Sequence, residues 1–199
     1  EIKQVTKDLG LNLRSGHVHI DKDWQRTVDE ASESGQQYLV CSSLPSRGQS
    51  IENYQRVAET FNTAAEGCQK ANLIFAYHNH EYEFEKDSGK VLYDILLTDT
   101  NPDLVKMELD LGWLIVTGND PLHYFEKYPG RFPLWHLKDM KKDKAESTEF
   151  GKGRIDIPQL FKNSGKSGMK YFFVEQEEYA GDPLESVKHN IDFLNKLQY

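Results

Sequence analysis

Short apolar runs of strand length alternate with helical patterns along most of this 199-residue chain. Strands that are separated by helical crossovers pair in parallel, and continuous apolar strands are typical of a sheet that is buried on both faces. The alternation therefore predicts an α/β fold with a parallel sheet. Six runs are predicted strands: 11–20, 37–41, 73–77, 104–110, 134–139 and 169–174.

The segments between these runs have the composition or the apolar spacing of helices. The longest is Ile51–Lys70, which follows Ser50, a candidate N-cap. With 38% hydrophobic residues, a chain of this length can bury one sizeable core, so we expect a single domain over residues 1–199. The other predicted helices are 1–9, 23–34, 92–97, 121–128, 157–164 and 183–197.

Charge and composition exclude several classes of protein. The net charge of -8, from 24 basic and 32 acidic residues, argues against a nucleic-acid partner, because tight binding to phosphates needs clustered cations. No stretch approaches the roughly 18 consecutive apolar residues of a membrane span. Cys41 and Cys68 have neither the spacing of a metal site nor the density of a disulfide scaffold, so we expect free buried thiols.

Free thiols favour a reducing compartment, and therefore the cytoplasm, by a small margin. The chain begins at Glu1 rather than at an initiator Met, so a removed leader, and with it the periplasm, stays open. Association into a homo-oligomer also stays open.

Polar side chains collect where the predicted strands end. In a parallel α/β barrel, the carboxyl ends of the strands form the edge at which active sites are built. Successive side chains of a strand alternate between faces, so His78 and His80 share a face, roughly 6.6 Å apart along the strand. These strand-end residues are His17, His19, His78, His80, Asp110, His136, Lys138, Asp139 and Glu175.

Two histidines, an aspartate and a glutamate from four strands could converge on one divalent cation. Mixed nitrogen and oxygen ligands suit Mn²⁺, Zn²⁺, Co²⁺ or Fe²⁺ better than Ca²⁺ or Mg²⁺. The alternative for His78 and His80 is a pair of hydrogen-bonded structural histidines. The alternative for Asp110 is a helix cap or a turn former.

Five motifs in a fixed order resemble the sugar phosphate isomerase/epimerase family, which belongs to the xylose isomerase-like TIM barrels. The similarity runs from about Leu11 to the C-terminus and implies a (β/α)8-type barrel. The motifs are Tyr77-His78-Asn79-His80-Glu81-Tyr82-Glu83-Phe84, Met107-Glu108-Leu109-Asp110-Leu111-Gly112-Trp113, Gly130-Arg131-Phe132-Pro133-Leu134-Trp135-His136-Leu137-Lys138-Asp139, Gly151-Lys152-Gly153 and Phe173-Val174-Glu175-Gln176.

The resemblance implies a set of metal ligands. Members of the family hold a divalent metal with Glu, Asp, His and a second Glu at four strand ends, and Asp110, His136 and Glu175 match the last three. The first ligand usually stands in a Glu-Asn-His pattern, which His78-Asn79-His80 matches with His78 in place of Glu. The two glutamates of the family also form its acid/base pair. His78 can ligate a metal or exchange a proton near neutral pH, so a one-base isomerisation, a dehydration or an elimination fits as well.

Two further departures concern space and length. Gly112 stands where relatives often carry an aromatic residue before the Trp113 position, which could widen the pocket. A complete barrel has eight strands and about 250 residues, whereas six strands are predicted here and the first resembles the third strand of the family. We therefore expect an N-terminally incomplete barrel without its first two βα units. The open sheet edges of such a barrel would favour aggregation.

The resemblance also implies catalytic roles. A bound cation would stabilise an enediolate formed by proton abstraction next to a carbonyl, with Glu175 as ligand and base. Lys138 would neutralise the oxyanion or contact a phosphate or hydroxyl group, and its alternative is a surface salt bridge. His78 is a catalytic candidate as well as a ligand.

Substrate contacts are expected from four residues. His17 and His80 are candidates for binding substrate hydroxyls or a metal-bound water, and Trp113 could stack on a sugar ring or belong to the core. Asp139 is a substrate-binding candidate that could instead orient a neighbouring group, as carboxylates behind metal ligands do. The flanking acids are expected to form a solvated rim: Glu81, Glu83, Glu177 and Glu178.

Three functions follow for a small carbohydrate substrate. The leading one is a metal-dependent isomerase or epimerase of a sugar or sugar derivative. The second is a dehydratase, hydratase or lyase acting on a keto-sugar such as an inosose or a 3-keto-glycoside, which the His78 substitution keeps open. The third is a non-catalytic carbohydrate-binding relative.

Overall fold

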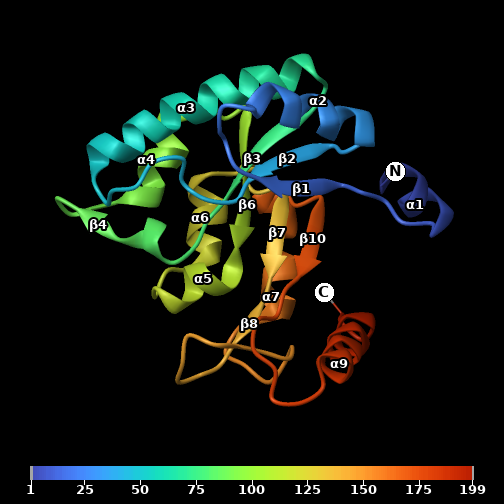
Figure 1. Ribbon diagram of the computed structural model, residues 1–199. Coiled ribbons are helices and arrows are strands. Elements are labelled where there is room, and N and C mark those ends of the chain that lie inside the picture. The colour runs from blue at the N-terminus through green and yellow to red at the C-terminus, as the bar shows by residue number, and fades with distance from the viewer. Residues whose placement is uncertain (1, 199) are drawn as a thin grey trace. The chain divides into compact units, whose positions relative to one another are not determined.

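The computed structural model describes residues 2–198 and is drawn in Figure 1. The chain forms two compact units that divide between Met107 and Glu108. Glu1, where the first predicted helix begins, and Tyr199 lie outside the described residues. The expectation of one domain over 1–199 stays a prediction.

Six strands form the main sheet, and their pairing confirms the predicted parallel α/β fold. The strand order is β1-β2-β3-β6-β7-β10, so neighbours in the sheet follow one another along the chain. The pairs β1·β2, β2·β3, β6·β7 and β7·β10 are parallel. The strands are β1 (Ser15–Val18), β2 (Tyr38–Cys41), β3 (Ile74–His78), β6 (Val105–Asp110), β7 (Leu134–Leu137) and β10 (Tyr171–Val174).

The first unit places helices on one side of β1 to β3 (Figure 1). Phe61 of α3 fills its core, with its ring centroid 5.3 Å from that of Phe75 and 4.8 Å from that of Tyr77. Ser50 is the expected N-cap of α3, because its Oγ accepts the backbone N–H of Asn53. The elements are α1 (Ile2–Asp8), α2 (Trp24–Ser34), α3 (Ile51–Lys70), the 3-10 helix η1 (Tyr82–Phe84), β4 (Lys86–Asp87), β5 (Lys90–Val91) and α4 (Leu92–Asp99).

The second unit packs its core around Trp135 of β7. The ring of Phe125 stacks on this indole at 5.3 Å with an interplanar angle of 5°, and Phe161 meets it edge-on at 5.9 Å. The elements are α5 (Leu111–Val116), α6 (Pro121–Lys127), β8 (Asp139–Met140), β9 (Ser147–Thr148), α7 (Ile157–Lys162), α8 (Ser164–Ser167) and α9 (Pro183–Asn195).

Several predicted boundaries are wrong. The first strand is only Ser15–Val18, so His19 follows the strand rather than belonging to it. The helix predicted over 157–164 is interrupted at Asn163, whose side-chain amide donates to the carbonyl of Gln159 and ends α7. The helix α5 and the hairpins β4–β5 and β8–β9 are absent from the sequence-based prediction.

No helix of residues 2–198 has both the length and the apolar character that crossing a membrane requires.

Candidate metal centre and active site

The strand ends of the second unit bring several charged side chains together. Asp110, the last residue of β6, pairs in register with His136 of β7. The backbone N–H of Glu175, which follows β10, donates to the carbonyl of Leu137 at 3.0 Å. Because parallel strands in register end at one edge, these side chains meet there.

Asp110, His136 and Glu175 form a group that could hold a metal ion. Each offers one ligand atom, and these atoms all lie within 4.8 Å of one another. Nδ1 of His136 is hydrogen-bonded to Oε2 of Glu175 and lies 4.0 Å from Oδ2 of Asp110. One imidazole and two carboxylates fit a divalent transition metal, for which ligand distances are about 2.0–2.2 Å.

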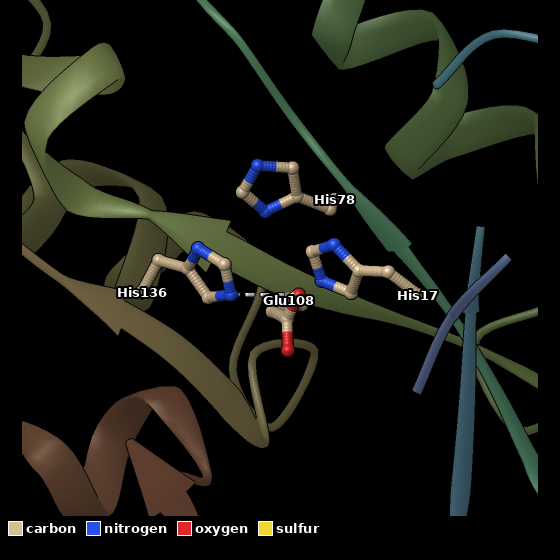
Figure 2. Close-up of side chains that lie close together, drawn as sticks. All are labelled: His17, His78, Glu108 and His136. Carbon is tan, nitrogen blue, oxygen red and sulfur yellow. Dashed lines mark ion pairs between the residues drawn. The ribbon is translucent and has the colours of Figure 1, made fainter. Parts of the chain in front are cut away.

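Glu108 holds the other side of the His136 ring. Its Oε2 lies 3.2 Å from Nε2 of His136, as the dashed line in Figure 2 marks. A carboxylate on one ring nitrogen fixes the tautomer, so that the other nitrogen points its lone pair at a metal. Glu108 is missing from the predicted site residues, although its position two residues before Asp110 puts both side chains on one face of the strand.

Burial and charge set the protonation of this group. Burial disfavours a charged imidazole, but the hydrogen bonds to Glu108 and Glu175 outweigh it and raise the pKa of His136 to about 10. Burial would likewise raise the pKa of Glu175, but His136 and Lys138 lower it to about 2. At Asp110 burial has the larger effect and raises the pKa to about 6, although the nearby Lys138 ammonium lowers it.

Lys138 is the cation among these carboxylates. Its Nζ lies 3.1 Å from Asp110 Oδ2, 3.6 Å from Glu175 Oε2 and 2.8 Å from Glu177 Oε1. The side chain is fully buried, which rules out the surface salt bridge that the sequence left open. Burial lowers the pKa of a lysine, but the three acids more than compensate and raise it.

Trp113 borders the same group from helix α5. Its ring lies under the Lys138 ammonium, 4.8 Å from Nζ to the ring centroid, which is a cation–π contact. Its backbone N–H donates to Asp110 Oδ1 at 2.9 Å, so Asp110 caps α5 through one oxygen while the other faces Lys138 and His136. The cap and the ligand interpretations of Asp110 are therefore compatible.

Asp139 has a different environment from the other strand-end acids. Its carboxylate is completely buried and accepts the backbone N–H groups of Met140, Gly151, Gly153 and Ile155 at 2.9–3.1 Å. A Cβ atom on Gly153 would lie 2.1 Å from Oδ1, so only glycine fits there. This geometry favours organising the loop, and the expected contact of Asp139 with substrate stays a prediction.

Two of the four acids expected to form a solvated rim, Glu81 and Glu177, are exposed, whereas Glu178 is half-buried and the expectation is wrong at Glu83. Glu177 pairs with Lys138, and Oε2 of Glu178 accepts both the backbone N–H and the hydroxyl of Ser147 at 2.6 Å. Glu83 is completely buried in the first unit, where it accepts the hydroxyl of Tyr77 and the backbone N–H of His80. Glu81 is exposed, as expected.

The histidines of the first unit gather at the ends of β1 and β3. The ring centroid of His78, which is 5% exposed, lies 5.1 Å from that of His17 and 5.0 Å from that of His80 (Figure 2 draws His17 and His78). His80 stacks on Tyr82 at 5.2 Å and its Nδ1 lies 3.1 Å from the tyrosine hydroxyl. Their expected roles in metal and substrate binding stay predictions.

Comparison with known proteins settles the family. The family model of the xylose isomerase-like TIM barrel matches residues 7–197. The chain belongs to this family. Its six-stranded parallel sheet is therefore part of a TIM barrel, as the sequence predicts.

Two solved structures described as sugar phosphate isomerase/epimerase, both from Parabacteroides distasonis, are similar throughout. One is 29% identical with a TM-score of 0.82, covering 96% of this chain and 73% of that one. The other is 27% identical with a TM-score of 0.85, covering 98% and 79%. This family relationship confirms the resemblance seen in the motifs.

Among curated proteins, the chain is similar to inosose dehydratases. That of Lacticaseibacillus casei is 25% identical and that of Clostridium perfringens 27% identical, each over 154 residues. Each match covers 67% of this chain and 51% of the relative. The chain thus spans about half the length of these curated relatives.

Proposed function

We propose that this chain belongs to a divalent-metal-dependent isomerase or epimerase of a sugar or sugar derivative. The observation that carries the proposal is the convergence of Asp110, His136 and Glu175 beside the ammonium of Lys138. The similarity to two solved sugar phosphate isomerase/epimerases supports the substrate class.

Asp110, His136 and Glu175 would hold one Mn²⁺, Zn²⁺, Co²⁺ or Fe²⁺ ion, with Glu108 orienting the imidazole. When bound, the ion supplies a Lewis acid that polarises a substrate carbonyl. His78 is the proposed counterpart of the family's first glutamate, as a ligand or as a group that exchanges a proton.

Glu175 is the proposed base. Its side chain is 33% exposed whereas that of Asp110 is buried, so Glu175 is the carboxylate of this group that a substrate can reach. It would take the proton from the carbon next to the carbonyl and return it to the product. Lys138 would stabilise the negative charge that develops on the substrate oxygen.

Trp113 is the proposed platform for a sugar ring, since its half-buried indole borders Lys138. His17 and His80 are proposed to bind substrate hydroxyls. For Asp139 we propose a positioning role in its loop, ahead of the direct substrate contact expected from the sequence.

A keto-sugar dehydratase is the second candidate, and the similarity to inosose dehydratases favours it. The first step is shared: Glu175 takes a proton next to the ketone. In a dehydration the electron pair then expels the hydroxyl group of the next carbon, which takes the proton back from Glu175 and leaves as water. A hydratase or another lyase would use the same groups, and a non-catalytic sugar-binding protein would need none of them.

Metal analysis tests the proposal first. We expect about one transition metal per chain in protein purified without chelator, and its loss in His136→Ala, because that imidazole is one of the proposed ligands. His123→Ala is the matched control, since His123 is exposed on α6. Protein that holds no metal and takes none up from solution would overturn the proposal.

Product analysis in D₂O separates the two reactions. An isomerase or epimerase incorporates deuterium at the carbon next to the carbonyl and leaves the composition of the sugar unchanged. A dehydratase gives an unsaturated ketone with a new ultraviolet absorption band. If the metal-loaded protein forms neither product with any of a panel of keto-sugars, the result favours the sugar-binding alternative.

A further inference from the structure

Lys138 points its ammonium at two of the oxygens that the candidate metal centre would use. Its Nζ lies 3.1 Å from Oδ2 of Asp110 and 3.6 Å from Oε2 of Glu175. These are the same two oxygens that face Nδ1 of His136. One pair of carboxylate oxygens thus lies next to both an imidazole and an ammonium group.

We propose that Lys138 competes with the divalent metal for Asp110 and Glu175, and that Glu177 relieves this competition by holding the ammonium. The lysine would then set how tightly the metal binds. This inference rests on the proposed metal centre.

Geometry makes the competition unavoidable. A metal ion ligated by Asp110 Oδ2 at about 2.1 Å would lie within about 5 Å of Nζ, because the lysine nitrogen is only 3.1 Å from that oxygen. At such a separation the repulsion between a divalent ion and an ammonium is large compared with thermal energy, even in a polar protein environment. Each cation therefore weakens the hold of the carboxylates on the other.

The lysine has little freedom to withdraw. A Cβ atom on Gly112 would lie 2.8 Å from its Cδ and 3.1 Å from its Cβ, so helix α5 passes directly against the stem. The Trp113 ring closes another side, 4.8 Å from Nζ. Absence of a side chain at Gly112 gives the buried lysine its place beside the carboxylates.

Glu177 offers the ammonium a partner outside the candidate ligand group. Its Oε1 lies 2.8 Å from Nζ, the shortest of the three ion pairs of Lys138, and its side chain is 40% exposed. Because this ion pair is already formed, Lys138 stays paired while Asp110 and Glu175 bind metal. Loss of the Glu177 charge would leave Lys138 dependent on those two carboxylates.

Two substitutions should therefore change metal affinity in opposite directions. Lys138→Met keeps much of the volume and removes the competing charge, and we expect Mn²⁺ or Zn²⁺ to bind about tenfold or more tightly. Glu177→Gln removes the alternative partner, and we expect binding to weaken by about threefold or more. Lys152→Met is the charge-matched control, because Lys152 is 55% exposed and pairs with Glu149.

Calorimetric titration of the chelator-stripped full chain with Mn²⁺ or Zn²⁺ alone measures these affinities, with circular dichroism to verify folding. If the wild-type chain binds metal and Lys138→Met binds it equally or more weakly, the inference is overturned, whereas the proposed metal centre is not. If Lys138→Met does not fold, unchanged or tighter binding in Glu177→Gln overturns it. A wild-type chain that binds neither metal overturns the proposed function and the inference with it.

Discussion

Glu108 and Asp110 show how two carboxylates on one strand face can take different tasks. Asp110 divides its oxygens between the N-terminus of α5 and the cationic groups Lys138 and His136. Glu108 is also completely buried, and its Oε2 lies 3.2 Å from the far nitrogen of the His136 ring. We therefore propose that Glu108 acts on a metal through the orientation and basicity of the imidazole.

Glu108→Gln should weaken metal binding without abolishing it. The amide oxygen can still accept the Nε2–H of His136, but the negative charge that strengthens the imidazole as a ligand is lost. We expect a loss of about 10–100-fold in metal affinity, measured by competition with a chelator. Glu126→Gln on the surface of α6 is the control, and equal affinities in the two variants would contradict this role.

The buried carboxyl of Glu83 predicts a pH-dependent stability in the first unit. Burial raises its pKa to about 7, and the hydrogen bonds from Tyr77 and His80 only partly oppose this shift. Between pH 4.5 and 7 the unfolded chain therefore loses a proton that the folded chain still holds. The contribution of Glu83 to the free energy of unfolding is complete below that window and decreases as the pH rises through it.

Glu83→Gln should remove this dependence. The variant gains stability relative to wild type between pH 5 and 8, by up to about 3 kcal/mol, since one pKa unit corresponds to about 1.4 kcal/mol. Urea unfolding at the two pH values measures the difference. The exposed Glu59→Gln variant should follow wild type, and a Glu83→Gln curve parallel to wild type would refute the assignment.

Secondary-structure elements were predictable where local pattern and tertiary packing agree. The apolar runs at β2, β3, β6 and β7 and the amphipathic α3 are recognisable because each buries a continuous surface. Helix α5 is short and begins Leu111-Gly112, with poor local signal. It forms because Asp110 caps it and Lys138 packs against Gly112.

The site was predictable to the same extent. Asp110, His136 and Glu175 follow from strand ends and the family motif, and the structure brings them together. Glu177 was not recognisable, because its contact with Lys138 spans 39 residues of sequence and depends on the path of the chain after β10. Sequence patterns identify which edge carries the chemistry, whereas long-range contacts decide which acids are buried there.

The loop after β9 is organised around one carboxylate. Asp139 accepts four backbone N–H groups, three of them from the Gly151–Ile155 segment. Each carboxylate oxygen accepts two of these N–H groups. In Asp139→Asn an NH₂ group replaces one oxygen and cannot accept, so at least two hydrogen bonds are lost. We expect a destabilisation of about 2–4 kcal/mol and faster amide exchange in residues 150–155.

Thermal unfolding and hydrogen–deuterium exchange measure the two effects. Asp143→Asn, at an exposed position of the preceding loop, is the control and should leave both unchanged. Normal protection of residues 150–155 in Asp139→Asn would show that the loop does not depend on this carboxylate.

Exposed apolar side chains on the last strand and last helix bear on how the chain behaves in solution. Phe172 and Val174 of β10 are 37% and 43% exposed, and β10 ends the strand order of the sheet. Leu184, Val187 and Ile191 recur at helical spacing on α9 and are 75%, 46% and 51% exposed. An unpaired edge strand with an apolar surface is a template for association.

We therefore expect this chain to self-associate, and to do so more strongly as salt increases. The net charge of -8 repels copies at low ionic strength, and salt screens this repulsion while leaving the apolar contacts intact. Val174→Lys should reduce association, since a lysine on an edge strand blocks pairing with another chain. Sedimentation velocity at about 50 mM and about 500 mM salt measures the effect. Gln25→Lys adds the same charge on the polar surface of α2 and controls for it, so equal suppression by both variants would show that charge alone, and not the β10 edge, governs association.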